Sequence, residues 1–202
     1  SSLALLRQGW TLIKRNRVFR LLVVVFMVTL PFRDYLGSLY QPHFVAAGVG
    51  TAWFGMSLAL AAALRMVGSR SAYLLEERLG RRWGLIVATV LPGLLYLLFA
   101  RVSYPVWTVL AFCALSGSMS LRTPLISAQL NAHIERRNRA TVLSLIGMLV
   151  GVYEAGMGLV VGAIADVSVP WALTLMGAIV LLGTLLLVVV PQDDEPGAPP
   201  VM

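Results

Sequence analysis

The chain has 202 residues, of which 58% are hydrophobic and 12% are charged, and its formal net charge is +7. Soluble domains carry about a quarter charged residues, so this composition excludes an ordinary soluble protein and indicates a membrane protein. The positive charge does not indicate a nucleic-acid partner, because the basic residues cluster between apolar runs, as they do in the cytoplasmic loops of membrane proteins.

Six apolar segments are long enough to cross a bilayer, so the sequence predicts an all-α membrane protein, a six-helix bundle over 18–190. The predicted spans are 18–40, 51–67, 83–100, 106–130, 140–165 and 171–190. Residues 1–17 are basic and mildly amphipathic, and we expect them to lie on the cytoplasmic membrane surface. The acidic, proline-rich tail over 191–202 is expected to be disordered.

The first span contains two charged residues, Arg33 and Asp34, just after Pro31, which is expected to interrupt the helix. Ionisable groups inside a membrane are costly and usually functional, so both are candidates for solute transport or proton coupling. Helical spacing places two further polar side chains, predicted to line a cavity, on the face of Asp34: Ser38 and Gln41.

The second and third spans are joined by a charged loop, predicted over 70–82. Between the first and second spans, residues 42–50 form a predicted loop without formal charge, in which His43 is expected to be solvated. The second span is rich in Ala and Gly, which suits close helix packing. Arg101 lies in the short turn after the third span.

Small polar side chains recur at helical spacing along the fourth span, and such residues are as often contacts between helices as the lining of a pore. The stripe consists of Ser116, Ser120, Thr123, Ser127 and Asn131, of which the first four are predicted to line a cavity. Arg122 lies beside it, about 24 Å from the outer end of the span. There it either snorkels to the cytoplasmic interface or contacts an anionic substrate.

The fifth span runs between Arg139 and Asp166 with a single ionisable side chain, Glu154. A carboxyl group on a packed helix face needs a partner or a proton, so we interpret Glu154 as a coupling or substrate site. A structural carboxyl bonded to a neighbouring helix is the alternative. Four glycines share its face and allow another backbone to approach: Gly147, Gly151, Gly158 and Gly162. The sixth span has no charge and is expected to face lipid.

Most of the 16 Lys and Arg residues fall at one face of the membrane if six spans alternate, whereas Arg101 lies at the other. The positive-inside rule then places both termini in the cytoplasm, and we expect a multi-pass protein of the cell membrane. Because the first residue is Ser, we also expect the chain to be part of a longer protein.

The charged loop resembles the cytoplasmic signature of the major facilitator superfamily. The matching residues are Glu77, Arg78, Gly80, Arg81 and Arg82, with Glu for the usual Asp and Tyr73 for the first Gly of the signature. Arg122, Pro124 and Asn131, with residues 139–144, are similar to the tract between the fourth and fifth helices of that family's C-terminal half. Residues 14–20 resemble the basic lead-in to its first helix.

The resemblance implies the C-terminal six-helix half of a twelve-helix secondary transporter, whose two halves rock around a midplane site. It implies that the first and fourth helices line the cavity, the second and fifth meet the other half, and the third and sixth face lipid. It also implies that Glu77, Arg78, Gly80, Arg81 and Arg82 form a gating loop that helps to close the cytoplasmic side.

We therefore expect proton-coupled transport of a small-molecule substrate, together with an N-terminal half or a second copy of the chain. A membrane-embedded enzyme is a rival, but His43 and His133 are predicted at opposite faces, Cys113 has no nearby His, and no zinc-ligand spacing occurs. No catalytic residue, cofactor or metal is predicted. A scaffold or receptor is a third alternative, but it would not need charges at mid-depth.

Counting along the helices places Arg33 and Asp34 about 20 Å, and Glu154 about 22 Å, from the cytoplasmic face. Two acids and one base at one depth leave one carboxyl without a partner, and burial favours its neutral form. Our hypothesis is that Arg33 pairs with Glu154 and Asp34 titrates. The alternatives are that Arg33 neutralises Asp34 while Glu154 titrates, or that the triad is purely structural.

Overall fold

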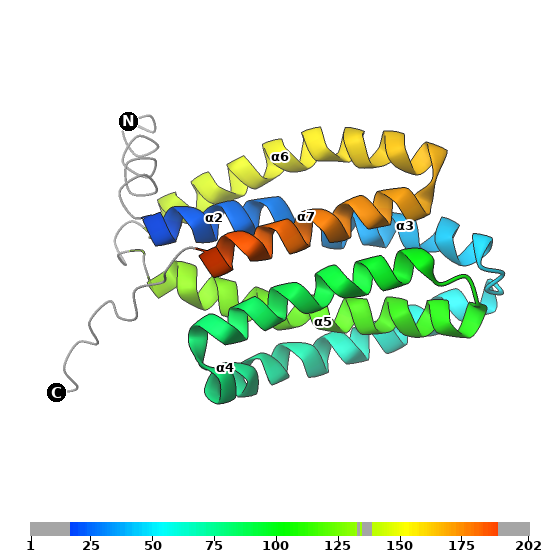
Figure 1. The fold of residues 1–202 in the computed structure, drawn as a ribbon, viewed down its shortest axis with the longest axis horizontal. Helices are drawn as coiled ribbons and strands as arrows, with labels where there is room; N and C mark the ends of the chain where they lie inside the picture. Colours follow the sequence, from blue (N-terminus) through cyan, green and yellow to red (C-terminus); the bar gives the residue numbers. More distant parts are fainter. Residues whose placement is uncertain (1–16, 133, 135–138, 190–202) are drawn as a thin grey trace.

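The computed structural model describes residues 17–132, 134 and 139–189, and every regular element defined there is an α-helix. The helices are α2 (Arg17–Thr29), α3 (Phe32–Ala46), α4 (Ala52–Arg101), α5 (Pro105–Ala132), α6 (Arg139–Val167) and α7 (Val169–Val189), which form one elongated bundle (Figure 1). Five stretches of the described chain are long and apolar enough to cross a membrane, so the all-α membrane class is confirmed. The predictions for 1–16, His133 and 191–202 lie outside the described residues.

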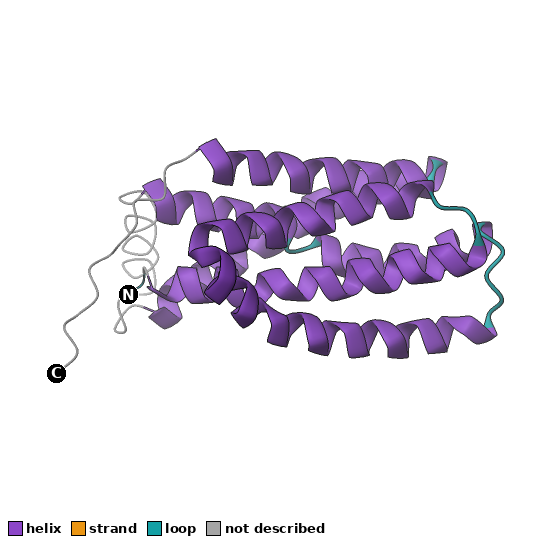
Figure 2. Ribbon diagram, turned by 60° about the horizontal axis from the view of Figure 1, so that its bottom comes forward, coloured by secondary structure: helices purple, strands orange, loops and turns teal. Residues whose placement is uncertain are grey.

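The first membrane segment is broken at Pro31, as the sequence predicts. Helix α2 ends at Thr29 and α3 begins at Phe32, because a proline has no N–H to donate and its ring clashes with the preceding turn. The backbone bridges the break with short turns, in which the Asp34 N–H donates to the Pro31 carbonyl at 2.9 Å. Figure 2 shows the break as a short loop inside the bundle. The charged residues of this segment therefore follow directly after a helix break.

Helix α4 consists of two arms, 52–79 and 81–101, which fold back on each other at Gly80 (Figure 1). Gly80 has φ 76° and ψ 167°, a conformation that other residues rarely adopt. A straight helix of 50 residues would be about 75 Å long, far more than a membrane needs. The loop predicted over 70–82 is therefore wrong in extent, because the good helix formers before Gly80 continue the first arm.

His43 is buried, so the expectation of a solvated loop histidine is wrong. Helix α3 continues through Pro42 to Ala46 and turns His43 inward, where only 4% of its surface is exposed. Its Nε2 lies 2.8 Å from the carbonyl oxygen of Phe99, and the two rings are 4.5 Å apart. This contact fixes the end of α3 against the end of the second arm of α4.

The helices differ in how deeply they are packed. In α5, 61% of the most apolar stretch is buried, whereas in α6 the share is 11%. Helix α5 lies against the first arm of α4, where a Cβ on Gly68 would be only 2.3 Å from the Gly117 carbonyl oxygen. Helix α6 instead borders α2, α3 and α7 with few contacts and leaves a gap towards α5. That gap contains the candidate site.

Candidate functional site

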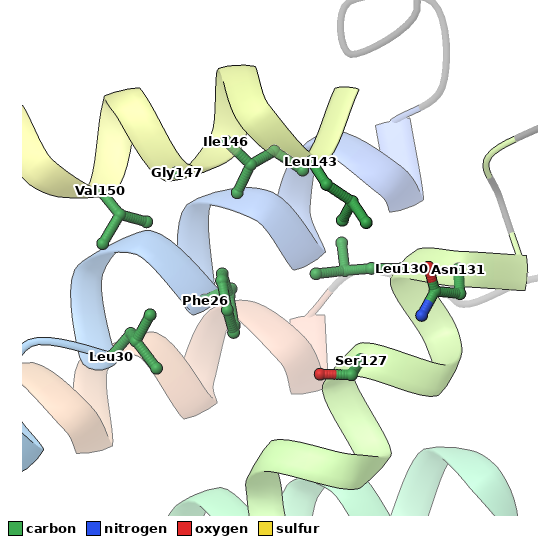
Figure 3. Close-up of a pocket in the computed structure, with 9 residues that line it drawn as sticks. All are labelled: Phe26, Leu30, Ser127, Leu130, Asn131, Leu143, Ile146, Gly147 and Val150. Atoms are coloured by element: carbon green, nitrogen blue, oxygen red, sulfur yellow. The ribbon is translucent and has the colours of Figure 1, made fainter. Parts of the chain in front are cut away.

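A pocket of about 340 Å³ lies between α2, α5 and α6. Figure 3 shows side chains from these three helices around one space. Apolar side chains make most of its wall, and the polar ones come from α5. The lining residues are Phe26, Leu30, Ser127, Leu130, Asn131, Leu143, Ile146, Gly147 and Val150. The pocket is therefore shared by the first, fourth and fifth predicted spans, on which the sequence concentrates its polar and charged residues.

Two uncharged polar groups, from Ser127 and Asn131, determine what the pocket can bind. The Asn131 side-chain oxygen is buried and accepts no hydrogen bond from the described part of the chain. A buried acceptor without a partner costs free energy. Because this oxygen exposes almost no surface, a solute with an N–H or O–H group could bind it only if the Asn131 side chain turned towards the pocket. The backbone carbonyl of Asn131 is already occupied by the Arg139 guanidinium at 3.3 Å. Within the described part of the chain, no ionisable side chain is among the lining residues.

The predicted cavity-lining stripe of α5 divides into three environments. Ser127 lines the pocket, whereas Ser116 is buried inside the bundle and Thr123 is exposed. Ser120 donates back to the Ser116 carbonyl at 3.4 Å, one turn earlier in the same helix. On α3, Ser38 and Gln41 are exposed. Helical spacing identified the polar face, but close packing at Gly117 buries its outer end.

Tyr35 links the first and fifth predicted spans at the level of the charged residues. Its hydroxyl donates a hydrogen bond to the Glu154 backbone carbonyl, and it lies within electrostatic reach of the Glu154 and Asp34 carboxylates. This agrees with the depth count, which puts Asp34 and Glu154 at one level. The sequence reasoning did not select Tyr35, although it adjoins Asp34.

Arg33 and Asp34 lie exposed on α3, while Glu154 is partly buried. Within the described residues no ion pair joins Arg33 to Glu154, so their pairing stays a prediction. Charged side chains cannot face lipid cheaply. The α3 face that bears them must therefore border water or another protein segment.

Arg122 is buried inside the bundle and does not snorkel to its surface. Its exposed fraction is 5%, and its electrostatic neighbour is Tyr96, whose hydroxyl donates to the Phe32 carbonyl at 2.6 Å. Phe32 directly follows the break at Pro31. Arg122 is not among the residues that line the pocket. Through Tyr96 it is instead connected to the break in the first membrane segment.

The predicted gating residues surround the reversal at Gly80. The Arg81 side chain lies 3.9 Å from the Glu76 carboxylate, and Arg82 donates to the Val188 carbonyl of α7 at 3.1 Å. Glu77 and Arg78 are exposed. Arg81 and Arg82 thus contact other residues of this bundle, whereas the exposed side chains of Glu77 and Arg78 are accessible to another protein segment. Among the described residues, no three His, Cys, Asp or Glu side chains group as metal ligands.

Comparison with known proteins gives one family. Residues 72–201, more than half of the chain, match the family model described as Major Facilitator Superfamily. No curated protein and no solved structure matches the chain. The matched range begins near the end of the first arm of α4 and covers α5, α6 and α7.

Proposed function

The chain belongs to the Major Facilitator Superfamily, and from that premise we propose that it is the C-terminal six-helix half of a secondary transporter working by alternating access. Six crossings result if α2 and α3 make one, the two arms of α4 make two, and α5, α6 and α7 make one each. The described ends, Arg17 and Val189, then share the end that the positive-inside rule assigns to the cytoplasm.

Cysteine labelling tests this topology in a Cys113→Ala background. The positions chosen are exposed in the bundle, so a failure to label reports membrane sidedness rather than burial. Cysteines at Val45 and Val167 should react with an impermeant maleimide added outside cells. A cysteine at Ser69 should react only from inside. The opposite result at either end would refute the assignment.

The pocket between α2, α5 and α6 is the observation that supports a solute site. Among the described residues its wall is largely apolar and carries no ionisable group, and its buried polar atom without a partner there is the Asn131 acceptor. This combination favours a neutral, mostly apolar solute with a hydrogen-bond donor over a sugar or a small anion. Alternating access would expose the pocket to the two sides in turn.

Proton coupling is proposed for the carboxyl groups around Tyr35. Asp34 is exposed on the charged face of α3, and Glu154 is joined to Tyr35 through its backbone. A proton taken up by Asp34 would remove a charge that lipid or a closed interface disfavours. The reverse assignment, with Glu154 titrating, predicts that Glu154→Gln rather than Asp34→Asn removes coupling.

The second half of the transporter is proposed to cover α6 and the first arm of α4, which are largely exposed in this bundle. The partner is an N-terminal six-helix half or, as the alternative, a second copy of this chain. The size of the complex in detergent distinguishes a single twelve-helix unit from a homodimer of separate chains.

Flux measurements with the complete transporter in proteoliposomes test the solute site. Under an imposed proton gradient, neutral amphiphilic amides should accumulate, whereas sugars and small carboxylates should not. Asn131→Leu should raise KM about tenfold, the effect of losing one hydrogen bond of about 1.4 kcal/mol. Ser127→Ala should raise it less. The matched control Ser71→Ala removes a hydroxyl that bonds only its own helix, to the Val67 carbonyl, and should leave KM unchanged.

The proposal fails if wild-type protein accumulates only sugars or anions. It also fails if Asn131→Leu and Ser127→Ala both keep the wild-type KM for a transported amide.

A further inference from the structure

Arg101 lies where two surface grooves meet, at the end of the bundle opposite Gly80. One groove, of about 610 Å³, runs between the second arm of α4 and the start of α5, past Leu98, Tyr104 and Trp107. The other, of about 270 Å³, lies between Arg101 and Trp171 at the start of α7. One cationic side chain therefore borders two neighbouring grooves.

The surface around these grooves suits contact with lipid. Along the second arm of α4 the exposed side chains at helical spacing are large and apolar: Trp83, Val87, Leu91, Leu94 and Leu98. This stripe ends at Arg101. The helix rises about 27 Å from Trp83 to Arg101, close to the roughly 30 Å of a hydrocarbon core. Arg101 therefore lies at the depth of lipid headgroups.

Aromatic side chains of the kind that anchor proteins at the membrane interface surround Arg101. Tyr104, Trp107 and Trp171 are all exposed beside it. Tyr and Trp concentrate at the headgroup level because their rings are apolar at one edge and polar at the other. The apolar walls of the grooves could therefore contact acyl chains, and the polar end at Arg101 could contact a headgroup.

The charges favour an anionic headgroup. Within the described part of the chain, no hydrogen bond or ion pair occupies the Arg101 guanidinium. Among the described residues neither groove is lined by a carboxylate, and Asp166, at the end of α6, lines neither of them. A phosphate could therefore bind Arg101 through two parallel N–H donors. The described lining of the grooves therefore offers no acidic partner for the amine of a zwitterionic headgroup.

We propose that Arg101 binds the phosphate of an anionic diacyl phospholipid, whose chains occupy the grooves beside Trp107 and Trp171. One phosphate and two chains match one guanidinium between two grooves. By the proposed topology this lipid belongs to the outer leaflet. The site is independent of the solute pocket, because the two share no residue.

Native mass spectrometry of the complete transporter tests this site, with phosphatidylglycerol and phosphatidylcholine of identical chains as probes. Wild-type protein should retain phosphatidylglycerol more strongly, because both lipids offer Arg101 a phosphate but only phosphatidylcholine adds a choline cation that opposes the guanidinium. Arg101→Gln should abolish that preference, and Arg101→Lys should keep part of it. Trp107→Ala should weaken both lipids alike. The control Arg70→Gln removes an exposed arginine at the opposite end and should leave the preference unchanged.

Equal retention of the two lipids by the wild type overturns the proposal, as does an undiminished preference in Arg101→Gln. Inorganic phosphate at millimolar concentration should not displace phosphatidylglycerol. Displacement would mean that the site recognises a free anion rather than a lipid. If Arg101→Gln fails to fold, the loss of both lipids in Trp107→Ala and the partial preference in Arg101→Lys decide the question.

Discussion

Gly68→Ala is expected to push the first arm of α4 away from α5. A Cβ at this position would lie 2.3 Å from the Gly117 carbonyl oxygen and 3.2 Å from its carbon, both backbone atoms that cannot rotate away. Carbon atoms pack at about 3.5–4.0 Å, so the two helices must separate by roughly 1 Å. Overpacking of this kind costs about 1–3 kcal/mol. In lipid the loss matters, because helix association depends on close packing.

The single cysteine of the chain provides the assay. Cys113 is 1% exposed, and its thiol lies 3.5 Å from the Ser57 carbonyl in the same interface between the first arm and α5. A maleimide that becomes fluorescent on reaction reports when heating opens this interface. For a domain of this size, a loss of about 1–3 kcal/mol should lower the labelling midpoint by about 2–12 °C.

Gly55→Ala is the matched control, because it lies on the same arm and a Cβ there would meet nothing within 4 Å. Both substitutions gain the same helix propensity, so the difference between them isolates the steric effect. Equal labelling midpoints for Gly68→Ala and Gly55→Ala would refute the close approach of α4 and α5.

Three further predictions concern the charged residues. Asp34→Asn should abolish accumulation driven by a proton gradient but spare solute exchange, and accumulation at wild-type levels would exclude Asp34 as the titrating group. Arg122→Lys should lower transport at normal membrane levels, because the guanidinium is buried beside Tyr96, and full activity would restore the snorkelling interpretation. Glu77→Gln should change the transport rate more than substrate affinity or expression, because Glu77 is exposed near the reversal at Gly80, and wild-type kinetics would reduce this segment to a topological anchor.

Features with a local physical cause could be predicted from the sequence. Pro31 breaks the first span because a proline disrupts the helix wherever it lies. The membrane class follows from the lengths of the apolar runs. Counting along the chain puts Asp34 and Glu154 at one level, and the hydrogen bond from Tyr35 to the Glu154 carbonyl agrees with that count although the first segment is broken at Pro31.

Features that depend on contacts between distant residues could not be predicted. The sequence places His43 beside a proline and glycines, which suggests a loop, but the contact with Phe99 keeps the helix running and buries the ring. The charged residues before Gly80 are compatible with either a loop or a helix. Asn131 becomes a candidate site residue only because α2 and α6 complete the pocket, and no described residue supplies a donor to its side-chain oxygen.

The exposed face of α6 carries glycines in addition to large side chains such as Met148, Val152 and Leu159. On α6, a Cβ on Gly147, Gly151 or Gly162 would meet nothing within 4 Å, so this face is open to another backbone. The second arm of α4 and α7 expose large side chains, including Leu94, Leu98, Leu182 and Leu185. Lipid is as apolar as leucine, so hydropathy cannot tell a lipid face from a helix-packing face in a membrane. Glycines on an exposed face are more informative, because they permit another helix to pack closely. The glycines of α6 therefore support the proposed partner bundle on that side, whereas the proposed lipid side is the one that ends at Arg101.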